Sequence, residues 1–106
     1  EIPYPMNPKM EIIEDEYNNQ ELTSLVYPNP VKEDKLTLKI SSTYVGDIKL
    51  VIYNSNIDKV SEYSFNKSTY NYDFDFTSKN LSNGIYFYKL LSNGFQIGYG
   101  KFSILK

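Results

Sequence analysis

LSNGIYFYKL, residues 81–90, predicts a turn followed by a β-strand. The turn falls at Asn83-Gly84, because glycine adopts positive φ values that Ile and Tyr avoid. Aromatic and β-branched residues follow it, a composition typical of strands. The strand has two apolar faces, formed by Tyr86, Tyr88 and Leu90 and by Ile85, Phe87 and Leu91. We therefore expect a strand inside a sheet that is covered on each side.

The step Leu81-x-x-Gly84-x-Tyr86 is similar to the tyrosine corner of immunoglobulin-like sandwiches. In that motif a Tyr hydroxyl binds the connection that leads into the strand. We accordingly expect Gly84 at positive φ and the hydroxyl of Tyr86 hydrogen-bonded to the preceding connection.

Six more segments have the alternation or the β-branched content of strands: residues 24–27, 36–40, 48–53, 60–65, 70–76 and 95–105. They recur about every ten residues, and no segment has a helical period of 3.6 residues. The pattern predicts an all-β fold, an immunoglobulin-like antiparallel β-sandwich of about seven strands.

Turn residues set the details of this fold. Asn93-Gly94 is a strong hairpin signal, and Gly98 and Gly100 indicate a bulge or a close approach within the last strand. In the turn after residue 53, we expect Asn56 to take the left-handed conformation.

The alternation also selects a core, for which we expect fourteen large side chains from both sheets. They are Leu36, Leu38, Ile40, Ile48, Leu50, Ile52, Phe74, Phe76, Leu81, Tyr86, Tyr88, Leu90, Phe102 and Ile104.

The composition narrows the possible chemistry. The chain has no Cys and no His, which excludes zinc sites and Ser-His or Cys-His catalysis built from its own side chains. All eleven basic residues are Lys, which disfavours nucleic-acid binding because base contacts favour Arg. No apolar run approaches the roughly 18 residues of a membrane span, so we expect no membrane insertion. We expect no catalytic residue, no metal and no cofactor.

Residues 1–21 differ from the rest in charge and proline content. They carry six acidic residues and one lysine, with Pro3, Pro5 and Pro8 close together. We interpret them as an acidic linker or the tail of an upstream module, and residues 22–106 as the folded domain.

Two clusters of acidic residues and one aromatic stripe each allow a structural and a functional interpretation. Asp73 and Asp75 lie on one face of a strand, where they fit acid–base catalysis less well than the polar face of a half-buried strand. The triplet 14–16 lacks the spacing of a calcium loop. The aromatics of residues 70–76 suit a core better than a sugar-binding platform.

From about Ser24 onward, the chain resembles the type A C-terminal sorting domains of type IX secretion (Por secretion system) substrates. The resemblance rests on five segments in order: Tyr27-Pro28-Asn29-Pro30, Leu36-x-Leu-x-Ile40, Gly46-x-Ile-x-Leu-x-Ile-Tyr53, Leu81-x-x-Gly84-x-Tyr86-Phe87 and Lys101-Phe102-x-Ile104-Leu105-Lys106. The turn after Tyr53 departs from the family, which has Asp and then Gly where this chain has Asn54 and later Ile57-Asp58.

The resemblance implies a non-catalytic sorting signal on an exported cargo protein of a Gram-negative bacterium. Its partners would be the outer-membrane translocon, a surface peptidase with the attachment machinery, and an N-terminal cargo domain. The cargo would pass through the periplasm to the cell surface or the extracellular space, and cleavage would fall in or near residues 14–25.

The same resemblance assigns site residues. Translocon recognition would involve Gly84, Tyr86, Lys101, Phe102, Ile104 and Lys106, with Tyr27, Pro28, Asn29 and Pro30 as the opening motif. Two other classes fit the sequence: a structural immunoglobulin-like module, and a carbohydrate-binding accessory module of a multidomain surface enzyme.

Overall fold

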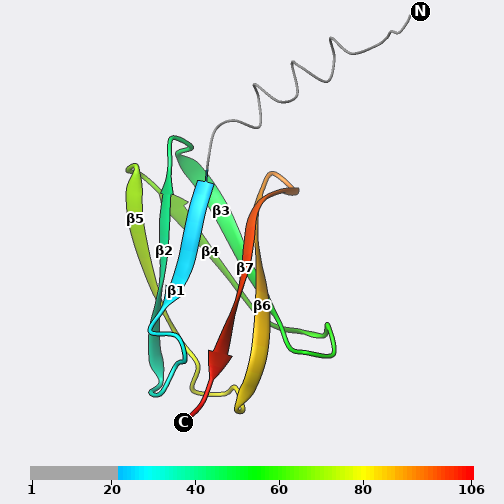
Figure 1. Cartoon of the computed structure of the whole chain (residues 1–106). Coiled ribbons are helices and arrows are strands. Elements are labelled where there is room, and N and C mark those ends of the chain that lie inside the picture. Colours follow the sequence, from blue (N-terminus) through cyan, green and yellow to red (C-terminus); the bar gives the residue numbers. More distant parts are fainter. Residues whose placement is uncertain (1–21) are drawn as a thin grey trace, which may run out of the picture.

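Seven antiparallel strands make up residues 22–106, the part of the chain that the computed structural model describes (Figure 1). They are β1 (Leu22–Tyr27), β2 (Lys35–Ser42), β3 (Gly46–Tyr53), β4 (Lys59–Lys67), β5 (Asn71–Thr77), β6 (Gly84–Ser92) and β7 (Phe95–Ile104). One sheet has the order β1-β2-β5 and the other β4-β3-β6-β7. The predicted all-β sandwich is confirmed.

Alternation decides which side chains enter the space between the two sheets. In β2, Leu36, Leu38 and Ile40 are each at most 1 % exposed, while the residues between them face outward. The inward residues of β3 are likewise buried. Because side chains alternate across a strand, the period of two in the sequence was enough to predict these faces.

The strand predicted after the turn at Asn83-Gly84 is β6, and it lies between β3 and β7. Its inner face, Tyr86, Tyr88 and Leu90, is buried as expected. Its outer face is not covered: Ile85 is 53 % exposed and Phe87 38 %. The expectation of cover on each side was wrong, since apolar residues also occur on sheet faces that meet solvent.

The β6–β7 hairpin turns at Asn93 and Gly94, with φ values of 52° and 82°. Two positive φ values in a two-residue loop fit the right-handed twist of a hairpin, so this prediction is confirmed. The register shifts at Leu90/Leu91, where the partner residues are Gly98 and Gln96, which is the expected bulge.

The expected close approach lies at Gly100. A Cβ added there would meet the ring and hydroxyl of Tyr88 at 2.5–2.7 Å. The Tyr88 hydroxyl lies 2.7 Å from Ser24 Oγ, which joins the two sheets, and burial raises the pKa of this phenol. Glycine is therefore needed at this position to leave room for the ring of Tyr88.

The β3–β4 loop differs from expectation at one residue. Ile57, not Asn56, has positive φ, at 67°. The side chain of Asn54 explains this geometry, because its Oδ1 accepts the N–H groups of Asn56 (2.9 Å) and Asp58 (3.0 Å). An Asx-type turn of this kind fixes the loop and leaves the left-handed position to the next residue.

The core largely follows the prediction. Twelve of the fourteen expected residues are buried, while Phe74 and Leu81 are only partly buried against the cluster. The interior also includes Val26 and Val31, which the alternation did not single out.

Lys67, at the end of β4, is a fully buried lysine that the sequence did not reveal. Its ammonium group donates to the carbonyl oxygens of Ser42 (2.8 Å), Tyr44 (2.7 Å) and Thr69 (2.7 Å). Three donors meet three acceptors, so this charge joins the β2–β3 and β4–β5 connections. Burial lowers the pKa of Lys67.

The proposed linker or upstream tail, residues 1–21, lies outside the described residues. Within residues 22–106, no helix has the length and apolar character that a membrane crossing requires.

Candidate functional site at the C-terminal end

β1 and β7 run side by side in the same direction, so the segment after β1 reaches the end of β7 (Figure 1). The N–H of Val31 donates to Ser103 O (2.7 Å), and the N–H of Leu105 donates to Val31 O (2.8 Å). The motif Tyr27–Pro30 adds a side-chain contact, because Asn29 Oδ1 accepts the N–H of Ser103 at 3.1 Å. Asn29 of the opening motif and the adjoining Val31 therefore cover the free edge of β7 near its C-terminal end.

The turn before β6 holds the other side of the same end. Gly84 has a φ of +155° and pairs with Ile104. The hydroxyl of Tyr86 donates to Ser82 O at 2.6 Å, so the expected tyrosine corner is present. Asn83 Oδ1 accepts the N–H of Lys106 at 3.0 Å.

The side chain of Lys106 is bound, although the residue lies at the surface. Its ammonium donates to Asp34 Oδ1 (2.8 Å) and to Ser78 O (3.0 Å), and its side chain keeps 28 % exposure. Donation from this ammonium lowers the pKa of Asp34. Lys106 therefore joins the C-terminus to two loops that are distant in sequence.

Most of the residues that the resemblance named gather at this end: the opening motif, Gly84, Tyr86, Phe102, Ile104 and Lys106. Lys101 lies apart from them, on the outer face of the four-stranded sheet opposite Phe87. Tyr86, Phe102 and Ile104 are at most 4 % exposed, so their side chains lie in the interior and not on the surface of this end.

Sequence reasoning missed the partners that hold the C-terminus. Asp34 and Ser78 lie in loops whose composition carried no signal beyond a turn. Asn83 was assigned to the turn, but its side-chain bond to Lys106 depends on where the C-terminus lies. Such contacts join residues 23 to 72 positions apart, which no local pattern encodes.

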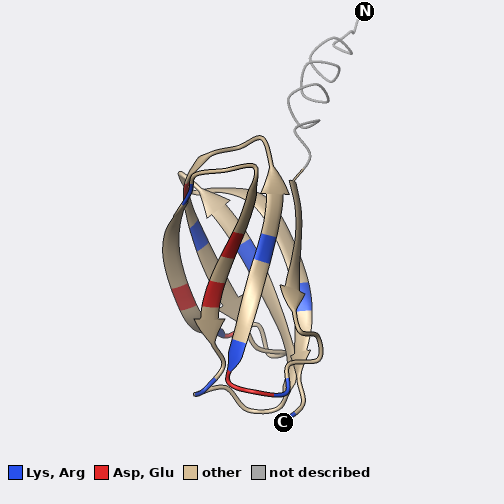
Figure 2. Ribbon diagram, turned by 90° about the vertical axis from the view of Figure 1, so that its left-hand side faces the viewer, with Lys and Arg blue, Asp and Glu red and all other residues tan. Residues whose placement is uncertain are grey.

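The paired carboxylates Asp73 and Asp75 have structural partners on β2. Asp75 accepts from Thr37 Oγ1 at 2.6 Å, and Asp73 lies 3.3 Å from Lys39 Nζ. Figure 2 shows the lysines of β2 beside the carboxylates of β5. This ladder is the polar outer face that the alternation predicted, and the expectation that these acids do not form a catalytic pair stays a prediction.

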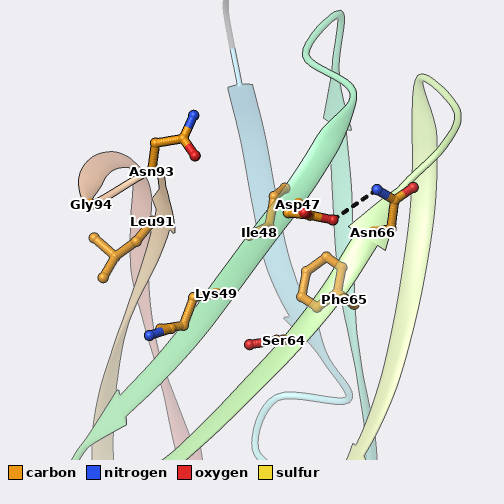
Figure 3. A pocket seen from close by; sticks show the side chains of 9 residues that line it. All are labelled: Asp47, Ile48, Lys49, Ser64, Phe65, Asn66, Leu91, Asn93 and Gly94. Carbon is orange, nitrogen blue, oxygen red and sulfur yellow. Dashed lines mark hydrogen bonds between the residues drawn. The ribbon is translucent and has the colours of Figure 1, made fainter.

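A shallow hollow crosses the outer face of the four-stranded sheet near the β6–β7 hairpin (Figure 3). Its lining includes Asp47, Lys49, Ser64 and Asn66, and Asp47 Oδ1 accepts from Asn66 Nδ2 at 2.9 Å. The one carboxylate is already hydrogen-bonded, and no second acid lines the hollow. Among residues 22–106, no cluster of acidic side chains is suited to hold a metal ion.

Comparison with known protein families finds one match. The model of the family described as "Secretion system C-terminal sorting domain" matches residues 25–102. No curated protein matches the chain.

Among solved structures, the chain is similar to the Pseudomonas fluorescens alkylpurine DNA glycosylase AlkC bound to DNA containing an abasic site analog. The TM-score is 0.50 at 14 % identity, over 81 % of this chain and 30 % of that chain. At this identity the likeness concerns the fold alone. The chain spans less than a third of the length of that protein.

Proposed function

The chain belongs to the family of secretion system C-terminal sorting domains, and from this premise we propose that residues 22–106 are the unit recognised by the outer-membrane translocon. Domains of this family are non-catalytic sorting signals for type IX secretion. The chain therefore interacts with the type IX machinery, which exports its substrates to the cell surface or the extracellular space.

The extent of the family match supports residues 22–106 as this unit. The family match begins within β1 and ends within β7, so it spans the whole sandwich. The strands β1 and β7 also contact each other, and the segment after β1 is hydrogen-bonded to the end of β7. A recognised element at the C-terminus would then depend on the fold of the complete sandwich.

The finer partners follow from the family. We infer an N-terminal cargo domain, passage through the periplasm of a Gram-negative bacterium, and cleavage by a surface peptidase in or near residues 14–25. A protease needs an extended segment without packing, and residues 22–25 of this range lie in β1, where they pair with β2, so we infer that the cut falls before β1.

The ten site residues divide into two roles in this proposal. Gly84, Tyr86, Phe102, Ile104 and the motif Tyr27–Pro30 would hold the shape of the C-terminal end, since the three large ones are buried. Lys101 and Lys106 would supply charge, with Lys106 oriented by Asp34. A partner that binds this end would contact a surface of fixed shape.

The test is a fusion of residues 22–106 to a reporter that is targeted to the periplasm of a host with a type IX system. We expect the reporter at the cell surface or in the medium, whereas the reporter alone remains in the periplasm. Retention of a folded, unmodified fusion would contradict the proposal that residues 22–106 suffice. Removal of Lys101–Lys106 is a poor test, because it also deletes the buried Phe102 and Ile104.

A further inference from the structure

Aromatic and lysine side chains form a continuous exposed surface on the outer face of the four-stranded sheet. We call it the aromatic–lysine face: Tyr53, Ile57, Phe87, Lys89, Tyr99 and Lys101. Register places Tyr53 opposite Phe87 and Lys89 opposite Tyr99, and all but Lys101 line one shallow groove. Phe87 is 38 % exposed and Tyr99 74 %. Clustered apolar groups of this kind, set among charges, are typical of interaction sites.

The loop beside this face presents a strained side chain. Ile57 has a φ of 67°, which a β-branched residue rarely adopts, and it is 67 % exposed. Asn54 fixes the loop through two side-chain hydrogen bonds and two backbone bonds. Folding alone gains little from an exposed Ile in this conformation, and an Asn or Gly would relieve the strain.

The charge of this sheet face is positive. Its outer side carries Lys49, Lys59, Lys89 and Lys101 against the carboxylates of Glu62 and Asp47. Glu62 is already shared by Lys49 (3.2 Å) and Lys59 (2.6 Å). Within residues 22–106, neither Lys89 nor Lys101 forms an ion pair, and Lys89 lies over the ring of Tyr53 at 5.4 Å. Two lysines of the aromatic–lysine face, Lys89 in the groove and Lys101 beside it, thus remain available to an acidic partner.

The outer face of the other sheet provides a contrast. There Lys35 and Lys39 lie 3.8 Å and 3.3 Å from the carboxylates of Asp75 and Asp73. Thr37 and Ser41 are hydrogen-bonded across the strands as well. That face is neutralised by its own residues, whereas the aromatic–lysine face is not.

We propose that the aromatic–lysine face docks on the secretion machinery, against a surface that combines acidic side chains with apolar ones. Lys89 and Lys101 would pair with its carboxylates, while Ile57, Phe87 and Tyr99 would bury apolar area. The inference rests on the proposed function and adds a second contact surface to the C-terminal end. Lys101 belongs to both the family motif and this face.

The experiment uses residues 1–106 fused behind a periplasm-targeted reporter in a host with a type IX system. Lys89→Gln with Lys101→Gln is expected to lower the exported fraction about tenfold, as the loss of two charge contacts would. The matched control, Lys35→Gln with Lys39→Gln, removes the same charge from the other sheet and is expected to export normally. The charge-conserving pair Lys89→Arg with Lys101→Arg is expected to export as the parent does.

Ile57→Asn separates docking from folding. We expect its melting temperature to rise, because the left-handed strain is relieved, while its exported fraction falls. If Ile57→Asn and the double variant Lys89→Gln with Lys101→Gln are both exported like the parent, the proposal is wrong. The unmodified fusion separates the two proposals. If it is exported, the proposed function stands whatever the variants do, and if it is retained, the proposed function itself fails.

Two other occupants of the aromatic–lysine face, a second copy of the chain and residues 1–21, would give different results. If sedimentation shows the purified chain to be a dimer that Phe87→Ser makes monomeric, a second copy occupies the face and the proposal is wrong. If deleting residues 1–21 increases amide exchange in β6 and β7, those residues cover the face and the proposal is wrong. A monomer with equal exchange in both forms supports a separate partner.

Discussion

At the scale of single residues, a few backbone and side-chain positions hold the two ends of the sandwich. Gly84 and Tyr86 act at the C-terminal end, where the corner hydroxyl binds Ser82 O. Lys67 acts at the opposite end, where one ammonium binds three carbonyls. Neither end is stabilised by burial of apolar area alone.

Gly84→Val should destabilise the domain by about 2 kcal/mol, because a β-branched residue is disfavoured at positive φ. Space is not the reason, since the nearest atom to an added Cβ is Tyr86 Cε1 at 4.0 Å. Urea denaturation measures the change. Tyr86→Phe is the milder companion, expected to cost about 1 kcal/mol for the lost hydrogen bond. A Val variant as stable as the parent would show that the glycine conformation is not required.

Lys67→Met should cost about 3 kcal/mol, because it leaves three carbonyl oxygens without their donor in a buried site. Lys49→Met is the control, since Lys49 keeps 48 % side-chain exposure and its ion pair with Glu62 is worth under about 1 kcal/mol. Thermal or urea unfolding of both variants gives the comparison. Equal stabilities would mean that water replaces the ammonium without loss.

At the scale of elements, β7 depends on residues from two other parts of the chain, β6 and the segment after β1. β6 pairs along its length, Val31 and Asn29 cover its free edge, and Gly100 admits the ring of Tyr88. The C-terminus beyond β7 is then held by Asn83 and Asp34. The end of β7 is therefore fixed only when the whole sandwich has formed.

The Asp34–Lys106 pair should make this end sensitive to acid. The pKa of Asp34 is lowered below its ordinary value of 3.8, so its contribution to stability is complete above that value and is lost as the pH falls through the lower, folded-state value. The stability difference between the parent and Asp34→Asn should accordingly be present at pH 7 and shrink below about pH 3.8. Glu33→Gln, at a site without an ion pair among residues 22–106, is the control. A difference that does not vary with pH would contradict this account.

At the scale of the whole molecule, the two outer sheet faces differ in character. On one, β2 and β5 carry a neutral ladder of paired polar groups beside the exposed Leu25 and Tyr27 of β1, and the other is aromatic and positively charged. The sorting signal thus has one end that is held by Asn83 and Asp34, and an exposed face that its own described residues do not neutralise.

The proposed domain boundary predicts a pattern of amide exchange across the molecule. Protection should begin in β1, whose amides pair with β2, and should be weak before residue 22. Exchange followed by mass spectrometry on residues 1–106 measures it. Strong protection across residues 3–18 would contradict a boundary at residue 22 and extend the domain toward the N-terminus.

Local patterns in the sequence were enough to predict the strands, the alternation of their side chains and the hairpin. Leu36, Leu38 and Ile40 alternate with polar residues, and Asn93-Gly94 permits two positive φ values in a row. These are local properties, set by the geometry of one strand or one turn. The corner at Gly84 and Tyr86 followed in the same way, since its partner Ser82 is only four residues upstream.

Which apolar faces are covered, and which polar groups contact each other, depends on how distant strands pack together. Phe87 and Leu90 lie on one strand with similar hydrophobicity, yet Phe87 is exposed and Leu90 buried, because only one face of β6 meets the second sheet. Lys67 resembles the surface lysines in sequence, but the loops around it supply three carbonyls. Lys106 finds Asp34 across 72 residues for the same reason: such contacts exist only after distant strands have been packed together.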